Sequence, residues 1–139
     1  MRLSPEQVKS VLKNLRFRSG LITAVVCDHR TKEVLMVAHQ NREALTRTLT
    51  EGRMYFWSRE KKRLWLKGES SGHFQLPVRM LIDCDGDAVL YYVKQLGGAC
   101  HEGYRSCFHR ELRDGEVKLI GRKIFDPSEV YKSRNPKYP

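Results

Sequence analysis

The side chains best suited to chemistry in this sequence gather between residues 83 and 107. This stretch holds three of the four cysteines and a run of alternating aspartates, namely Cys84, Cys100 and Cys107 with Asp83, Asp85 and Asp87. The cysteines are 16 (100 − 84) and 7 (107 − 100) residues apart. Thiolates are good ligands for zinc, whereas carboxylates prefer magnesium or calcium. The stretch therefore contains ligands for two different kinds of metal ion.

The aspartates stand between two apolar segments that are typical of β-strand, one ending at Ile82 and one covering residues 88–93. Along a strand, successive side chains point to opposite faces. If the strand continues through the motif, the three aspartates share one face and Cys84 points to the other. We therefore predict a hard-cation site formed by the carboxylates and a separate soft-metal site that uses Cys84.

Common metal-binding motifs do not fit this spacing. An EF-hand needs Gly at loop position 6 and Glu at position 12, where this chain has Ala88 and Lys94. Zinc fingers and ribbons need cysteine pairs two to four residues apart, and the signatures of nucleobase deaminases and HExxH zincins are absent as well. On spacing alone, two interpretations stay open: metal binding, or buried structural thiols next to a polar Asp-Gly turn.

Five short segments in register narrow the choice. They are YFWSR (55–59), LWLKGESSG (64–72), DCDGD (83–87), ACHEG (99–103) and SCF (106–108). With these motifs in this order, the chain resembles the phosphoribosyl-AMP cyclohydrolases of histidine biosynthesis over roughly residues 15 to 112. It departs from the usual family pattern at Phe56, His73 and Glu102, where that family commonly has Tyr, Asn and a small residue. These departures leave the metal-binding side chains intact.

The resemblance implies a homodimer with zinc at the subunit interface. The ligands that it implies are Cys100 and Cys107 of one chain with Cys84 of the other for zinc, and Asp83, Asp85 and Asp87 for magnesium. The cofactors expected are therefore Zn²⁺ and Mg²⁺. A Cys84 that faces away from the aspartates agrees with a thiol that reaches across an interface.

The reaction implied by the resemblance is hydrolytic opening of the adenine ring of phosphoribosyl-AMP. Water adds at C6 and the N1–C6 bond breaks, which gives a formimino carboxamide ribonucleotide. Zinc with three protein ligands and one open position is suited to activating that water. Three thiolates put more negative charge on zinc than three imidazoles would. We therefore expect the zinc-bound water to be less acidic than in a site with three histidines, so that a nearby proton acceptor matters more. His101 is the candidate for this role.

Two segments are candidates for holding the substrate. Trp57 and Trp65 flank a dense basic turn, which suits base stacking and phosphate binding. The Gly- and Ser-rich stretch that follows allows backbone and hydroxyl groups to approach a phosphate. Each pattern by itself is also typical of an ordinary loop, and only the resemblance gives it weight. The substrate-binding residues predicted are Trp57, Ser58, Arg59, Lys67, Gly68, Ser70, Ser71 and Gly72.

Length and composition indicate one folded domain. The chain has 139 residues, 40% of them hydrophobic, and we predict a single cyclohydrolase domain over residues 1–139 with a loosely held tail at 126–139. Some members of the family carry a second, pyrophosphohydrolase domain, and the 32 residues after Cys107 (139 − 107) are too few for one. No apolar run approaches the ~18 residues of a membrane span, and no secretory signal is present. We therefore expect a cytoplasmic protein without a membrane partner, and unpaired cysteines fit that reducing compartment.

The excess of basic over acidic residues is compatible with two kinds of binding partner, a nucleic acid or a phosphorylated substrate. The formal net charge is +10 and the pI is about 9.7. A small zinc-stabilised nucleic-acid-binding module is the rival function, supported by the mixture of aromatic and basic residues at 57–65. A substrate with two phosphates is served equally well by Arg and Lys. The aspartates favour the nucleotide substrate, because clustered carboxylates repel nucleic acid unless a cation intervenes. We expect no nucleic-acid partner.

The elements that must position these residues are mostly short strands. We predict an α+β fold with an antiparallel or mixed sheet and short helices, in one domain that forms a homodimer. Ser4, Pro5 and Gln7 predict a capped helix start, and Asn41 predicts a second helix that ends at Gly52. Cys27, far in sequence from the other cysteines, is predicted to be a structural thiol. Strands are predicted over residues 21–26, 34–38, 54–57, 64–66, 78–83, 88–93 and 117–120.

Overall fold

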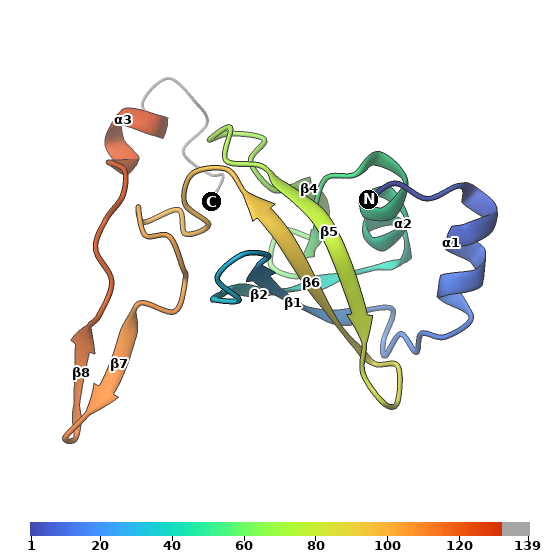
Figure 1. The fold of residues 1–139 in the computed structure, drawn as a ribbon, viewed down its shortest axis with the longest axis horizontal. Coiled ribbons are helices and arrows are strands. Elements are labelled where there is room, and N and C mark those ends of the chain that lie inside the picture. Colours follow the sequence, from blue (N-terminus) through green and yellow to red (C-terminus); the bar gives the residue numbers. More distant parts are fainter. Residues whose placement is uncertain (132–139) are drawn as a thin grey trace.

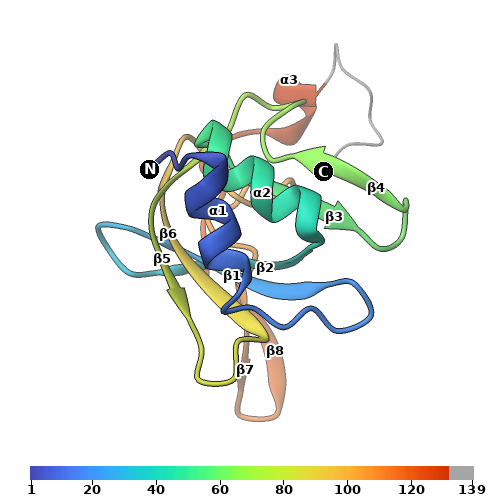
Figure 2. The same cartoon turned by 90° about the vertical axis from the view of Figure 1, so that its right-hand side faces the viewer.

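The computed structural model describes residues 1–131 and places them in a six-stranded sheet, two helices on one side of it, and a separate hairpin (Figure 1). Figure 2 shows α1 and α2 lying together across the sheet. The elements in chain order are α1 (Pro5–Leu12), β1 (Ile22–Asp28), β2 (Val34–Gln40), α2 (Arg42–Glu51), β3 (Tyr55–Ser58), β4 (Arg63–Leu66), β5 (Gln75–Ile82), β6 (Ala88–Gln95), β7 (Arg110–Arg113), β8 (Glu116–Leu119) and α3 (Pro127–Tyr131).

The large sheet is mixed, with the strand order β4-β3-β2-β1-β6-β5. Neighbouring strands are antiparallel except β1 and β6, which run parallel with Thr23 opposite Ala88 and Asp28 opposite Val93. The prediction of an α+β fold with a mixed sheet is confirmed. The parallel pair has a consequence for the site, because the segment before β6 lies at the start of β1 and the segment after β6 lies at its end.

Both main helices begin where their capping residues predict, and α2 also ends at the predicted Gly52. The Ser4 side chain accepts the Gln7 N–H at 3.2 Å while the Gln7 side chain accepts the Ser4 N–H at 2.8 Å, which is a complete capping box. The side chain of Asn41 accepts the Ala44 N–H at 2.8 Å, and Gly52 ends α2 in the left-handed conformation. Local sequence therefore sets both helix boundaries.

The core lies between these helices and the sheet. Its buried apolar residues include Val8, Ile22, Val26, Leu35, Leu45, Leu49, Phe56, Val89 and Tyr91. The one hydroxyl among them is satisfied, since Tyr91 donates to Gln40 Oε1 at 2.9 Å. Cys27 is buried at the end of β1, and burial raises the pKa of its thiol, in keeping with a structural role.

The β7–β8 hairpin stands away from the large sheet, at the lower left of Figure 1. Residues 112, 117 and 119 share one of its faces, because Leu112 pairs with Val117 and side chains alternate along a strand. Leu112, Val117 and Leu119 are 74%, 65% and 65% exposed. Only β8 of this pair was predicted, because the charged sequence of β7 lacks a strand pattern. The hairpin has an apolar face that nothing else in residues 1–131 covers.

The C-terminal segment is predicted to be a loosely held tail from residue 126. Its first part forms the short helix α3, and residues 132–139 of the predicted tail lie outside the described residues. Within the part of the chain that the structure describes, no helix has the length and apolar character needed to cross a membrane.

Candidate metal centre

Cys100 and Cys107 come together in the loop that follows β6. The loop folds back on itself, with the Ala99 N–H donating to Arg105 O at 2.9 Å and the Cys100 N–H donating to Tyr104 O at 3.1 Å. The two thiols are in hydrogen-bond contact. Burial of the Cys107 thiol and the charge of Cys100 raise the pKa of Cys107 to about 11, although the residue as a whole is exposed. A cation between the thiols would reverse this effect, as expected for paired metal ligands.

Three consecutive residues, Arg105, Ser106 and Cys107, hold this loop on the β1–β2 hairpin. The Cys107 N–H donates to Leu35 O at 2.8 Å, and Ser106 Oγ donates to Val34 O at 2.7 Å. Arg105 forms an ion pair with buried Asp28 and a second with Glu33 at 3.2 Å. The positions of the thiols are therefore set by packing against distant strands.

Lys67 places a buried positive charge under the thiols. The residue is only 7% exposed, and its Nζ donates to Ala99 O at 2.5 Å. Burial lowers the pKa of Lys67, while the nearby thiols of Cys107 and Cys100 act in the opposite direction. Its contact with a substrate stays a prediction. The structure adds a second role, since Lys67 ties the end of β4 to the cysteine loop and offsets thiolate charge.

Glu102 and His109 lie close to Cys100. One donor atom each of Cys100, Glu102 and His109 lies within 4.8 Å of the other two. The His109 ring stacks on Tyr104 with a centroid distance of 3.8 Å and an interplanar angle of 5°. Sequence reasoning missed His109, and its place two residues after Cys107 is the only signal for it. His101, the predicted proton acceptor, is exposed at the surface of the same loop.

The three aspartates lie in the turn between β5 and β6, so the continuous strand on which the shared-face argument depended is not present. β5 ends at Ile82, and Gly86 adopts φ 75°, which turns the chain. Asp83 Oδ1 accepts the N–H groups of Asp87 at 3.1 Å and of Ala88 at 3.3 Å. The side chain thus replaces the strand's backbone pairing with a turn. One oxygen from each of the three carboxylates nevertheless lies within 4.8 Å of the others.

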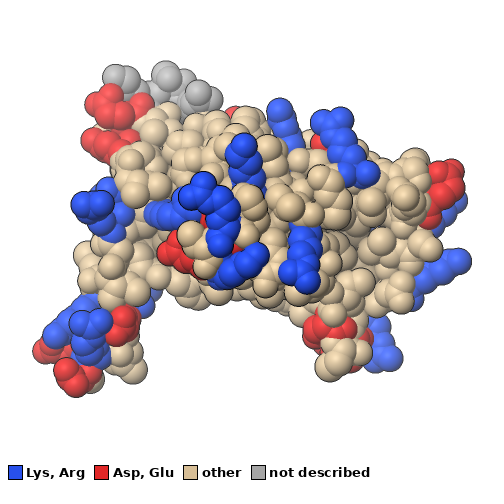
Figure 3. Space-filling model, viewed as in Figure 1, with Lys and Arg blue, Asp and Glu red and all other residues tan. Residues whose placement is uncertain are grey.

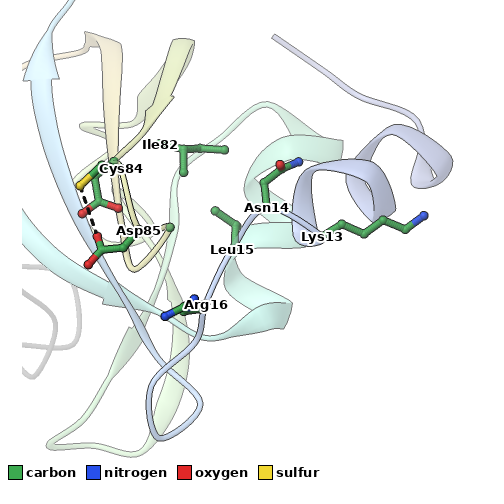
Figure 4. A pocket seen from close by; sticks show the side chains of 9 residues that line it. Lys13, Asn14, Leu15, Arg16, Ile82, Cys84 and Asp85 are labelled. Atoms are coloured by element: carbon green, nitrogen blue, oxygen red, sulfur yellow. Dashed lines mark hydrogen bonds between the residues drawn. The ribbon is translucent and has the colours of Figure 1, made fainter.

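Cys84 lies in the same turn and beside an aspartate. Its Sγ is 3.8 Å from Asp85 Oδ1, and both residues line an open pocket formed with residues 13–16 (Figure 4). The expectation that Cys84 points away from the aspartates depended on a continuous strand and does not hold. Asp87 makes its own ion pair with Arg18 at 3.1 Å. The turn is therefore a polar, exposed site with one thiol at its surface.

Within one chain, Cys84 does not meet Cys100 and Cys107. The turn precedes β6 and the cysteine loop follows it, so they lie at opposite ends of this strand (Figure 1). Eight residues of strand at ~3.3 Å each separate the two ends by roughly 25 Å. A metal shared by all three thiols needs two chains.

Comparison with known proteins agrees with these motifs. Residues 36–109 match the family model described as phosphoribosyl-AMP cyclohydrolase. A protein of that name from Methanosarcina acetivorans is 55% identical over 120 residues, covering 86% of this chain and 98% of its relative. The chain belongs to the phosphoribosyl-AMP cyclohydrolase family.

Relatives from other organisms give the same result. The phosphoribosyl-AMP cyclohydrolase of Methanothermobacter thermautotrophicus is 54% identical and that of Chlorobaculum tepidum is 51% identical. These alignments cover 88% and 91% of this chain and 92% and 93% of the relatives. The cyclohydrolase family is a family of hydrolases, and this chain is such an enzyme.

The residues predicted to bind the cyclohydrolase substrate fall into two places. Trp57, Ser58 and Arg59 line an open hollow of about 530 Å³ together with His39 and Trp65. Burial and the charge of Arg59 lower the pKa of His39. This first place combines aromatic faces with a cation, as stacking on a base and pairing with a phosphate require.

The second place is the loop after β4. Gly68 and Gly72 have φ angles of 92° and 78°, and the Gly72 N–H donates to Gly68 O at 2.8 Å, so this loop is a tight turn. Lys67, Gly68 and Ser70 are buried, Ser71 is half-buried and Gly72 is exposed. None of residues 67–72 lines the hollow at Trp57, so the structure does not bring the two predicted sets into one cavity.

A further cavity opens directly on the cysteine loop. It has a volume of about 450 Å³, and its lining includes Cys107, His109, Arg110 and Lys123. Two cationic side chains next to the Cys107 thiol suit a substrate that carries phosphate. No sequence pattern distinguishes Arg110 and Lys123 from the other Lys and Arg residues, which number 26 in all.

Proposed function

We propose that this chain catalyses the cyclohydrolase reaction of histidine biosynthesis, in which water opens the adenine ring of phosphoribosyl-AMP at the N1–C6 bond. Water adds to C6, and the oxygen of this water becomes the carboxamide oxygen. N1 leaves C6 as the formimino nitrogen and takes a proton. The observation that carries the proposal is the thiol pair of Cys100 and Cys107 beside a cavity that Arg110 and Lys123 line, in a chain of this family.

The residues present fit a zinc ion. Two thiols in contact form half of a tetrahedral thiolate set, and buried Lys67 reduces the cost of holding their negative charge. Cys84 from a second chain would be the third protein ligand. When bound, zinc would supply the Lewis acidity that activates water. We assign acceptance of that water's proton to His101, which is exposed and therefore able to pass it to solvent.

The turn that contains Asp83, Asp85 and Asp87 fits magnesium. Its clustered carboxylates are oxygen ligands on an exposed turn, where a cation keeps part of its water shell. A cation there would also lessen the repulsion between the carboxylates and the substrate's phosphates. This agrees with Mg²⁺ as the second cofactor.

A homodimer follows from the same arrangement. Cys84 can meet the thiols after β6 only if it comes from a second chain. The apolar face of the β7–β8 hairpin also needs a partner surface, because a lone two-stranded hairpin is only marginally stable in water. Exposed Leu81 and Ile82 directly precede the aspartate turn and are available for such a contact. We propose that the hairpin of one chain packs near the turn of the other and so completes two equivalent zinc sites.

The substrate's two phosphates and its base need separate contacts. Arg110 and Lys123 line the cavity at Cys107, while Trp57 and Arg59 line the hollow on β3. The predicted loop residues Lys67, Gly68, Ser70, Ser71 and Gly72 are retained as part of the substrate-binding proposal. Figure 3 shows Lys and Arg spread over the visible face and mixed with Asp and Glu, which favours a small nucleotide over a nucleic acid strand.

The compartment proposed is the cytoplasm. All four cysteines are free, and three of them are proposed metal ligands that must remain reduced. An oxidising compartment would pair the adjacent thiols of Cys100 and Cys107 and remove the metal site.

The direct test is an assay of purified protein with phosphoribosyl-AMP, in which opening of the purine ring is followed by its ultraviolet absorbance. We expect turnover that a zinc chelator removes and that added Zn²⁺ with Mg²⁺ restores. A parallel binding assay with single- and double-stranded oligonucleotides addresses the rival function. A metal-loaded protein that leaves the nucleotide intact but binds oligonucleotides would contradict the proposal.

A further inference from the structure

Cys100, Glu102 and His109 form a group of metal-binding side chains that lies within a single chain. Their sulfur, oxygen and nitrogen donors all lie within 4.8 Å of one another. A thiolate, a carboxylate and an imidazole together suit zinc or cobalt better than magnesium or calcium. The proposed shared zinc site uses Cys84, Cys100 and Cys107, so this group has only Cys100 in common with it.

His109 is oriented as a metal ligand before any metal is present. Its Nδ1 is 3.1 Å from Ser106 O, which can only accept, so Nδ1 carries the proton. The lone pair is then on Nε2, which lies 4.0 Å from Glu102 Oε2. In a metal-binding histidine, the ring nitrogen that does not bind the metal usually donates its N–H to a carboxylate, a backbone carbonyl or water. Ser106 O is in the position of such an acceptor. The ring is also 8% exposed and stacked on Tyr104, so it loses little freedom on binding.

The group is anchored at both ends by the same loop. Cys100 is 3% exposed and fixed by its N–H bond to Tyr104 O, and His109 stacks on the ring of that same Tyr104. The third donor, Glu102, is on a side chain that is 62% exposed and able to move the short distance that coordination requires. Two fixed donors and one adjustable donor are sufficient for a preorganised site.

We propose that a single chain binds one zinc-type ion through Cys100, Glu102 and His109, without any ligand from Cys84. Such a site lets a separate chain acquire its metal before the thiol of a second chain is in place. With one thiolate in place of three, it binds more weakly than the shared set. The inference concerns metal binding alone and does not depend on the cyclohydrolase activity.

The experiment uses the full chain with Cys84→Ser, which removes the shared thiolate and leaves the in-chain group intact. Metal-free protein is titrated with Co²⁺, and the visible d–d bands and the near-ultraviolet thiolate band report geometry, ligand type and stoichiometry. Zn²⁺ is then added in competition. We expect one Co²⁺ per chain with a tetrahedral spectrum that contains sulfur and nitrogen ligands.

Three second substitutions in that background assign the ligands. His109→Phe keeps the ring stacked on Tyr104 but removes the nitrogen, and it should weaken Co²⁺ binding by at least roughly tenfold. Glu102→Gln, on an exposed side chain that the fold does not need, should also weaken binding, by a smaller factor. His101→Ala, in the same loop but outside the group, is the matched control and should bind Co²⁺ as the Cys84→Ser background does.

Several outcomes would overturn the inference. One is a Cys84→Ser protein that takes up no Co²⁺, and another is unchanged affinity in both the His109→Phe and Glu102→Gln variants. Equal losses in His101→Ala and His109→Phe would also do so, because the nitrogen ligand would then be unassigned. Circular dichroism of each metal-free variant separates misfolding from loss of a ligand. None of these readouts changes if the wild-type protein proves inactive on phosphoribosyl-AMP.

Discussion

The two ends of β6 carry the two predicted metal sites, and they are built differently. The cysteine loop after β6 is held by Leu35, Arg105 and Lys67, through contacts to strands distant in sequence. The aspartate turn before β6 is shaped by its own Asp83 and Gly86, and within residues 1–131 only a backbone bond from the Arg16 N–H to Gly86 O at 2.7 Å and an exposed ion pair to Arg18 tie it to another segment. The first is embedded in the fold and the second is a surface turn.

The difference follows from the chemistry of the donors. Thiolates brought together need burial, a compensating charge and fixed positions, since they repel each other and their protonated forms do not bind zinc. Carboxylates around a hydrated cation need only proximity, because water completes the coordination. We therefore expect changes in the cysteine loop to abolish function and changes in the aspartate turn to moderate it.

The largest effect is expected from the cysteine loop itself. Cys100→Ser or Cys107→Ser should lose tightly bound zinc and lower kcat/KM by more than roughly a hundredfold, because even outer-shell partners of a metal cost 10- to 100-fold. Metal analysis after gel filtration and the ring-opening assay measure the two losses. Cys27→Ser is the matched control and should keep both properties. Full zinc content in Cys84→Ser, Cys100→Ser and Cys107→Ser alike would refute the assignment.

A mixed dimer tests whether the two ends of β6 meet across an interface. Cys84→Ser and Cys100→Ser chains should each be inactive alone. In a co-expressed heterodimer, both lesions fall in one zinc site and the other site is wild type, so about half of the sites should recover. Differently tagged chains allow the heterodimer to be isolated and assayed. A verified heterodimer that remains inactive contradicts the shared site and leaves the cyclohydrolase proposal standing.

The aspartate turn should respond more mildly. Asp85→Asn removes one charged oxygen ligand from an exposed site, so we expect the Mg²⁺ concentration for half-maximal rate to rise by roughly tenfold with zinc content unchanged. Activity measured against Mg²⁺ concentration, together with metal analysis, checks both statements. Glu6→Gln, an exposed carboxylate on α1 outside the turn, is the control. An unchanged Mg²⁺ dependence in Asp85→Asn would mean that the carboxylates only shape the turn.

The smallest effect concerns stability, at the ion pair that holds the cysteine loop. Burial by itself raises the pKa of Asp28, but hydrogen bonds from the Thr31 and Arg30 N–H groups and the charge of Arg105 leave it below the ordinary value. A carboxylate with a lowered pKa stabilises the fold above its unfolded pKa of about 3.9, and this is lost as pH falls through the folded pKa.

Asp28→Asn should therefore lower the free energy of unfolding by about 1–3 kcal/mol at pH 7 and by clearly less at pH 3. Urea unfolding of metal-free protein at the two pH values measures this difference. Glu33→Gln removes the more exposed partner of Arg105 and should cost less at pH 7. An equal cost for Asp28→Asn at both pH values would show that packing, and not the charge, holds the loop.

Local sequence determined much of this protein. Ser4 and Asn41 set the helix starts because a capping side chain acts on N–H groups two or three residues away. The hairpin of β1 and β2 followed from apolar runs about a polar turn. The side chains proposed to bind metal were recognisable by type and order, since these are properties of the chain before it folds.

Only the tertiary structure decided how those side chains are arranged. Asp83–Asp87 form a turn, and not the continuous strand on which the shared-face argument depended, because Gly86 and the Asp83 carboxylate turn the chain between its apolar flanks. Lys67 approaches Ala99, and His109 approaches Cys100, through packing between segments that no sequence spacing relates. The eight extended residues of β6 keep Cys84 at the opposite end of this strand from the other two thiols. Contacts between distant segments depend on how the whole core packs. The candidate metal ligands could therefore be named from the sequence, whereas their arrangement in space could be seen only in the folded structure.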